Sequence, residues 1–288
     1  MEKLIASIEA GGTKFVVAVA DNNFQVIKQV QISTTTPEKT LEEVIAFLKQ
    51  FEIQAIGVGS FGPIDIDKRS KTYGYITTTP KIGWANFDFL GMLKAAFDVP
   101  IAWTTDVNAS AYGEYLQEAV NSLVYFTIGT GIGGGAIQNG EFIGGVTHAE
   151  MGHACVMPHP DDIDFAGSCP FHGKNCLEGV AAGPSIEARV GVAGERLPRT
   201  HEVFDLIAYY VAQAAYNSYV TLAPERIIFG GSVLQEEDMI KVRQYFTKFN
   251  NGYVTTPDLE KLIQRPRIEN NGSATIGNFA LALNELKK

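Results

Sequence analysis

The sequence lacks any uninterrupted run of about 20 apolar residues, the length that a helix needs to cross a membrane. It also lacks, at its start, the charged segment followed by an apolar stretch that marks a signal peptide. Positive charge is in short supply, because 23 Lys and Arg against 32 Asp and Glu leave a net charge of −9. Without clustered Lys and Arg, we expect neither a nucleic-acid surface nor a membrane partner, and we expect a cytoplasmic protein.

Cysteine is scarce too, and the three in the sequence cannot all pair with one another, which favours a reducing compartment. Two of them belong to a compact Cys-x2-His-x3-Cys pattern with one more histidine upstream: His153, Cys169, His172 and Cys176. Zinc prefers four tetrahedral nitrogen and sulfur ligands, so the pattern predicts a zinc ion that staples the loop 154–168. The alternative is a set of unrelated polar loop residues and a core histidine. The third cysteine, Cys155, has apolar neighbours and is predicted to be a small buried side chain, not a ligand.

A strand, a glycine-rich turn and a second strand occur twice in the sequence. The first copy spans 4–20 with its turn at 11–14, and the second spans 123–140 with its turn at 129–135. A third glycine turn, 230–233, follows another short strand. The repeat predicts an internal duplication and therefore two similar α/β lobes with a cleft between them.

The length of the chain agrees with two lobes, because 288 residues are enough for about two domains. We expect an N-terminal lobe over 1–116, with a C-terminal helix at 275–288 packing back on it. The second lobe is expected over 117–274, and it carries the zinc loop. A hydrophobic content of 45% supports a substantial core, so the whole fold is not expected to depend on the metal.

The turn 129–135 contains the glycine spacing of a dinucleotide-binding loop, but that motif needs a helix directly after it. The residues that follow, 136–140, are too rich in turn formers for a helix. We therefore interpret the turns 11–13 and 129–135 as hairpins whose backbone N–H groups surround phosphate oxygens. Thr13 and Thr130 offer hydroxyl donors there. Ordinary hairpin turns without a ligand are the alternative.

Asp106 directly follows the strand 101–105 and precedes a helical pattern that ends near Gln117. A carboxylate in that place can accept the proton of an attacking hydroxyl, or it can simply cap the helix. Glu150 and Glu178 flank the metal segment and could bind sugar hydroxyls. The alternative is that both are solvated surface charges.

Five segments, in order along nearly the whole chain, resemble the ROK family of sugar kinases: 8–14, 105–109, 127–135, 150–153 and 169–179. Within that family the likeness is stronger to the bacterial fructokinases. It lies in the segments 9–14, 60–63, 159–162 and 169–173.

The resemblance implies an actin-like, hexokinase-type (ribonuclease H-like) fold and transfer of the ATP γ-phosphoryl group to the 6-hydroxyl of fructose, with Asp106 as general base. The implied sugar-binding residues are Gly62, Glu150, His153 and Glu178. The implied nucleotide-binding residues are Gly11, Gly12, Thr13, Lys14, Thr130, Gly131, Pro184, Gly230 and Gly231. The implied zinc ligands are His153, Cys169, His172 and Cys176. Mg²⁺ is expected on the phosphates, and a homodimer is expected from the same resemblance.

Two positions depart from the pattern of many relatives. Glu9 stands where many have Asp, which changes the expected positioning of metal or water. Thr105 stands where many glucose-using relatives have Asn, and a lost carboxamide contact costs about 1–3 kcal/mol, so we expect fructose to be preferred over glucose. A glucokinase or mannokinase of the same family is one alternative, and a sugar-sensing protein without activity is another.

Overall fold

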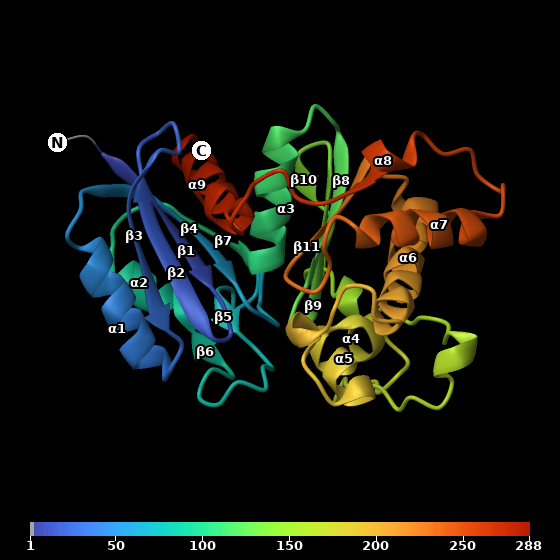
Figure 1. Ribbon diagram of the computed structural model, residues 1–288. Helices are drawn as coiled ribbons and strands as arrows, with labels where there is room; N and C mark the ends of the chain where they lie inside the picture. Colours follow the sequence, from blue (N-terminus) through green and yellow to red (C-terminus); the bar gives the residue numbers. More distant parts are fainter. Residues whose placement is uncertain (1–2) are drawn as a thin grey trace. The chain divides into compact units, whose positions relative to one another are not determined.

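The structure is a computed structural model that describes residues 3–288, and these form two compact units. The first unit contains the chain up to Glu118, together with Ile143–His148 and Ile268–Lys288. The second contains Ala119–Phe142 and Ala149–Arg267. The C-terminal helix α9 (Ser273–Leu286) therefore belongs to the same unit as the N-terminal strands (Figure 1).

The first unit is built on a five-stranded sheet with the order β3-β2-β1-β4-β7. The three strands β1, β2 and β3 are antiparallel neighbours, and β4 and β7 continue the sheet parallel to β1. The strands are β1 (Leu4–Ala10), β2 (Lys14–Ala20), β3 (Val26–Ser33), β4 (Ile53–Ser60) and β7 (Ile101–Thr105).

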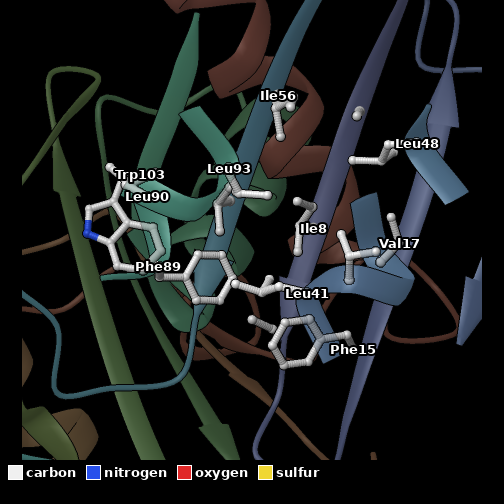
Figure 2. Close-up of a cluster of buried hydrophobic side chains, with 14 of the residues drawn as sticks. Ile8, Phe15, Val17, Leu41, Leu48, Ile56, Phe89, Leu90, Leu93 and Trp103 are labelled. Carbon is white, nitrogen blue, oxygen red and sulfur yellow. The ribbon is translucent and has the colours of Figure 1, made fainter. Parts of the chain in front are cut away.

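One face of this sheet carries the main apolar core of the unit (Figure 2). The helices α1 (Pro37–Leu48) and α2 (Phe89–Ala96) pack their apolar side chains there. Alternate strand residues such as Ile8, Phe15 and Val17 meet them, because side chains of a strand alternate between the two faces. A small ribbon, β5 (Tyr75–Ile76) with β6 (Phe87–Asp88), precedes α2.

The opposite face is covered by α3 (Asp106–Gln117) and α9, and glycines allow these helices to come close. A Cβ atom added to Gly57 of β4 would lie 1.9 Å from the carbonyl oxygen of Asn278. A Cβ atom on Gly277 of α9 would lie 1.8 Å from the carbonyl oxygen of Ala109. Since real Cβ atoms do not approach so closely, larger residues at either position would force α9 away from α3 and β4.

The second unit has a sheet of the same design, with the order β10-β9-β8-β11-β12. Again three antiparallel neighbours are continued by two parallel strands. The strands are β8 (Ser122–Ile128), β9 (Ile132–Gln138), β10 (Glu141–Phe142), β11 (Arg226–Gly230) and β12 (Ile263–Gln264). The repeated strand–turn–strand pattern of the sequence is thus the start of two sheets with one topology.

Helices of the second unit lie between and after these strands. They are α4 (Leu177–Ala181), α5 (Gly183–Val190), α6 (Val203–Leu222), α7 (Asp238–Asn250) and α8 (Leu259–Leu262). Three short 3-10 helices accompany them: η1 (Met151–His153), η2 (Pro160–Asp162) and η3 (Gly194–Arg196). Among residues 3–288, no helix combines the length and apolarity required to span a bilayer.

Candidate functional site

Asp106 is the first residue of α3, directly after β7 ends. The preceding residue, Thr105, is the helix cap, because its hydroxyl accepts a hydrogen bond from the N–H of Asn108 at 3.1 Å. Asp106 is half-buried, and its Oδ1 accepts the N–H of Val107 at 2.9 Å. The capping role considered for Asp106 therefore falls to Thr105. A carboxylate in the first turn is stabilised as an anion by the helix dipole, which suits a base.

Glu9 is a carboxyl-bearing neighbour of Asp106 within the first unit. It lies beside Gly59 in the register of β1 and β4, and a Cβ atom on Gly59 would be 3.1 Å from the Cα atom of Asp106. Burial raises the pKa of Glu9 to about 7, the charge of Asp106 adds to the rise, and the Lys14 ammonium opposes it. Glu9 is therefore a buried carboxyl group that can hold a proton near neutral pH beside Asp106. Sequence reasoning noted Glu9 only as a departure from Asp and missed this coupling.

The first glycine hairpin joins β1 to β2 and holds four of the predicted nucleotide residues: Gly11, Gly12, Thr13 and Lys14. The N–H of Gly11 donates to the carbonyl oxygen of Lys14 at 3.1 Å. The hydroxyl of Thr34, after β3, donates to the carbonyl oxygen of Gly11 at 2.8 Å. Gly12 and Thr13 are exposed, and no atom lies within 4 Å of a Cβ atom added to Gly12. The turn is thus open at its tip, as a phosphate-binding turn must be.

The second glycine hairpin joins β8 to β9 and is enclosed by other segments of the second unit. The N–H of Gly183, at the start of α5, donates to the carbonyl oxygen of Gly129 at 2.7 Å. After β11, the N–H of Val233 donates to the carbonyl oxygen of Ile128 at 3.1 Å, and Gly231 adopts a φ of +83° that favours glycine. These contacts bring together the predicted nucleotide residues of this unit, Thr130, Gly131, Pro184, Gly230 and Gly231.

The four predicted metal ligands form one cluster: His153, Cys169, His172 and Cys176. Their ligand atoms all lie within 4.8 Å of one another. The Cys169 Sγ atom is 3.9 Å from the His153 Nδ1 atom and 3.7 Å from the His172 Nδ1 atom. The Cys176 Sγ atom is 3.7 Å from the same His153 nitrogen. Tetrahedral zinc with bonds of about 2.3 Å to sulfur and 2.0 Å to nitrogen places sulfur and nitrogen about 3.6 Å apart, so a zinc-sized ion fits.

Cys155 lies next to this cluster without belonging to it. The predicted burial of this side chain is wrong, because Cys155 is exposed while Cys169 and Cys176 are buried. It forms an isolated antiparallel bridge with Cys176. Its partner in this bridge, Cys176, is buried, and sequence periodicity did not reveal the pairing.

The segment 159–162 anchors the loop 154–168 to two helices. The Arg189 guanidinium of α5 forms a buried ion pair with Asp162, with 2.7 Å between Nη2 and Oδ2. The hydroxyl of Tyr210 in α6 donates to Asp162 at 2.7 Å and accepts the N–H of His159 at 3.0 Å. The Arg189 charge and these hydrogen bonds offset the desolvation of Asp162, whose pKa lies below its usual value. This segment, which contributed to the resemblance, is therefore structural.

The two glutamates near the cluster are positioned by it. Glu178 lies in the first turn of α4, two residues after Cys176, and its Oε2 atom accepts the N–H of Ile132 at 2.9 Å. The carbonyl oxygen of Glu150 accepts the N–H of His153 at 3.0 Å. Glu178 is half-buried and Glu150 is exposed. Glu178 thus connects the metal loop to the second glycine hairpin, a link that the sequence did not suggest.

Gly62 lies just after β4, beside a buried histidine that sequence reasoning missed. The Nε2 atom of His148 accepts the N–H of Ile64 at 3.1 Å, and a Cβ atom on Gly62 would be 3.4 Å from the His148 ring. Pro63 and Thr147 contribute to a cavity of about 270 Å³ in this part of the first unit. His148 stands alone in the sequence, so no spacing signal could have identified it.

The profile of the ROK family matches residues 5–285. The chain belongs to the ROK family. It is 56% identical to a fructokinase of Streptococcus mutans over 288 residues, which cover 98% of each chain. It is 55% identical to a fructokinase of Lactococcus lactis, again over 98% of each chain. The family that the sequence motifs suggested is therefore confirmed.

The ROK hexokinase of Thermus thermophilus has the same fold. Its structure superposes with a TM-score of 0.80 at 23% identity and covers 99% of both chains. The predicted α/β, hexokinase-type fold is confirmed.

Proposed function

We propose that this ROK protein is an ATP-dependent fructokinase that transfers the γ-phosphoryl group of MgATP to the 6-hydroxyl of D-fructose. The observation that carries the proposal is the 56% identity to the Streptococcus mutans fructokinase across 98% of both chains. The geometry of each unit supports the chemistry, because it supplies a base, open and enclosed glycine hairpins, and a cluster of sugar-binding groups on a metal-anchored loop.

Asp106 is proposed as the general base. It is partly exposed at the start of a helix, and Thr105 caps that helix in its place, so the carboxylate does not have to serve as the cap. It takes the proton of the sugar 6-hydroxyl as that oxygen attacks the γ-phosphorus. Phosphoryl transfer depends mainly on positioning and charge stabilisation, and such a base contributes by orienting the nucleophile.

The sugar is proposed to be held by Gly62, Glu150, His153 and Glu178. The His153 Nδ1 atom faces the two cysteine sulfurs, so a bound metal takes Nδ1 and leaves the Nε2–H group as a donor. Glu178 uses Oε2 for the N–H of Ile132 and offers Oε1 to a sugar hydroxyl. Fixed donors and acceptors of this kind define which hydroxyls a sugar must present.

ATP is proposed to bind at the two glycine hairpins through backbone N–H groups and the hydroxyls of Thr13 and Thr130. Mg²⁺ bound to the phosphates supplies the neutralisation of negative charge that the transfer requires. In the second unit, Pro184 and the pair Gly230–Gly231 are proposed to contact the nucleotide. The exposed tip of the first hairpin and the open space beside Gly12 support this assignment.

The metal cluster is proposed to hold a structural zinc ion. Two cysteines and two histidines are a common donor set for zinc, and the sulfur–nitrogen separations of 3.7–3.9 Å suit tetrahedral coordination. Zinc there fixes the segment that carries Glu150 and Glu178. We further propose that the enzyme works in the cytoplasm as a homodimer, which light scattering of the purified protein tests.

The test is sugar-dependent ADP release by the purified protein with MgATP and fructose, mannose or glucose. We expect the highest kcat/KM with fructose. A preference for glucose or mannose would support the assignment as a sugar kinase and contradict the assignment of fructose as the substrate. Absence of turnover with every sugar, together with measurable sugar binding by calorimetry, would instead indicate a sensor.

A further inference from the structure

The exposed thiol of Cys155 lies directly across a backbone bridge from Cys176, one of the buried metal-ligand candidates. The N–H of Leu177 donates to the carbonyl oxygen of Ala154 at 3.0 Å, and the N–H of Val156 donates to that of Asn175 at 3.4 Å. Both hydrogen bonds join residues that flank the two cysteines, and none joins the cysteines themselves. Cys155 and Cys176 are therefore a non-hydrogen-bonded antiparallel pair. Side chains of such a pair project from the same face of the ladder.

This pairing is close to the geometry of a disulfide. Cα atoms of a non-hydrogen-bonded pair are about 4.5 Å apart, within the range of about 4.4–6.8 Å found in disulfides. The Cβ atoms of opposed residues are about 4.5–5.5 Å apart, against about 3.8 Å in a disulfide, so a shift of roughly 1 Å suffices. The backbone bridge of Cys169 is to Gly173, although its Sγ atom lies within 4.8 Å of the Cys176 Sγ atom in the cluster, so Cys169 is the competing partner that the experiment must distinguish.

Accessibility differs sharply between the two thiols. Cys176 is 1% exposed, whereas Cys155 is open to solvent. Oxidants reach exposed thiols first, and an oxidised cysteine next to a second thiol is resolved by forming a disulfide. Cys155 is therefore the entry point for an oxidant, and Cys176 is the sulfur that it meets.

We propose that Cys155 is a redox-modification site that, when oxidised by a peroxide, captures Cys176 as a disulfide and removes it from the metal. In the first step the Cys155 thiol reacts with hydrogen peroxide to give a sulfenic acid and water. In the second step the Cys176 thiolate attacks the Cys155 sulfur, forms the S–S bond and expels hydroxide. The metal is left with three protein ligands. This inference rests on the proposed zinc at the cluster.

The consequence reaches Glu178 through the chain. Glu178 follows Cys176 by two residues and holds the N–H of Ile132 in the second glycine hairpin. Releasing the metal frees the segment 150–176 and loosens the turn from which α4 begins. Oxidation is thus expected to weaken sugar binding. The effect is expected to be reversible, because a dithiol reductant with added zinc restores both the thiols and the bound metal.

The experiment begins with reduced protein, freed of reductant, whose zinc content is measured by mass spectrometry of the metal. Hydrogen peroxide is then added while a chromogenic chelator reports zinc release, and peptide mapping identifies disulfides. We expect one zinc equivalent to leave per chain, with a disulfide between Cys155 and Cys176. The matched variant Cys155→Ser is expected to contain the same zinc before oxidation and to release only a small fraction of it in the same time.

Three results would overturn the inference. The first is a disulfide between Cys169 and Cys176 with Cys155 unmodified. The second is equally fast zinc release from Cys155→Ser. The third is Cys155→Ser protein without zinc, which would make Cys155 a ligand. If the reduced wild-type protein contains no zinc, the zinc proposal is overturned, but peroxide is still expected to form the disulfide between Cys155 and Cys176. If that disulfide is also absent, the proposed pairing of the two cysteines is overturned.

Discussion

The two sheets share one strand order and both units bury apolar side chains, but the second unit has polar cross-links in addition. In the first unit, Phe89 packs its ring 6.0 Å from that of Phe15 and 5.2 Å from that of Trp103, inside a large apolar cluster. In the second unit, the buried pair of Arg189 and Asp162 and the metal cluster hold a long irregular segment against the helices. Apolar packing is common to both copies, since the rings of Phe126 and Phe229 stack at 5.3 Å in the second unit, and the second copy adds polar cross-links for its irregular segment.

The difference follows from what is inserted into each copy. Between η1 and α4 of the second unit, the chain forms only the short helix η2 and isolated bridges. Loops longer than about 12–15 residues without secondary structure are uncommon unless they are functional, and such loops need added constraints to stay ordered. We infer that the first unit supplies a rigid platform for the base, and the second a cross-linked loop for sugar recognition.

The largest expected effects are on enzyme kinetics, and they differ between the two units: a change in the first unit should lower kcat, and a change in the second should raise KM. Asp106→Asn in the first unit should lower kcat by about 10²–10⁴-fold with little change in sugar affinity, because the amide cannot take the proton. Glu178→Gln in the second unit should mainly raise KM for the sugar, since it weakens a binding contact and the Ile132 anchor. Steady-state kinetics and calorimetric sugar binding measure both. A kcat of Asp106→Asn within tenfold of the wild type would refute the base.

Loss of the metal should damage the second unit selectively. Cys176→Ser removes a ligand, so we expect loss of the metal, a lower Tm and faster hydrogen exchange in residues 150–178, while β1 and β4 keep their protection. Cys155→Ser is the matched control, because it changes a cysteine outside the cluster. Peptide-resolved hydrogen exchange is the measurement, and uniform loss of protection in both sheets would contradict a local role for the metal.

A core substitution should have the converse effect on the first unit. Phe89→Ala opens a cavity among Phe15, Trp84 and Trp103, which should cost about 3–5 kcal/mol of unfolding free energy. Metal content should be unchanged. Denaturant unfolding together with metal analysis checks both statements, and a folded variant that loses its metal would show that the units depend on each other.

The sequence predicted well what depends on short-range patterns. The strand–turn–strand repeats and the helix after Asp106 were recognised, since alternating apolar residues and glycine turns specify them locally. The four candidate metal ligands were found because closely spaced cysteines and histidines are an unusual pattern, and the structure brings them together; that they bind a metal stays a prediction. The motif resemblance then supplied roles that no local pattern contains.

The rest depends on contacts between distant segments. The strand β3 (Val26–Ser33) was missed because most of its residues are exposed and its side chains do not alternate clearly. Three pairs of neighbours arise only when distant segments come together in the fold: Glu9 with Asp106, Glu178 with Ile132, and Cys155 with Cys176. No spacing rule predicts such pairs before the sheet order is known.

A smaller effect is expected from the buried carboxyl group of the first unit. The pKa of Glu9 is raised to about 7 in the folded protein from an ordinary value of 4.5. The folded state therefore binds this proton more tightly, so its stabilising contribution is complete below pH 4.5 and is lost as the pH rises through 7. The loss is about 3 kcal/mol.

Glu9→Gln isolates this contribution, because the amide keeps the shape and stays neutral. The unfolding free energy of the variant minus that of the wild type should be larger at pH 8 than at pH 5. Urea unfolding at the two pH values gives the comparison. An equal difference at both would mean that Glu9 does not bind a proton in this range.

The smallest expected change in stability concerns the helix cap beside the base. Asn caps helices at least as well as Thr, so Thr105→Asn should change the unfolding free energy by less than about 1 kcal/mol. Its carboxamide adds the sugar contact that we expect Thr105 to lack, which should raise the glucose-to-fructose ratio of kcat/KM by roughly tenfold to a hundredfold. Thr105→Ala is the control, because it loses the cap without gaining an amide and should leave that ratio unchanged. If all three proteins have the same ratio, this position does not determine sugar preference, and the other proposed sugar contacts, Gly62 and the loop that carries Glu150, His153 and Glu178, are the next to test.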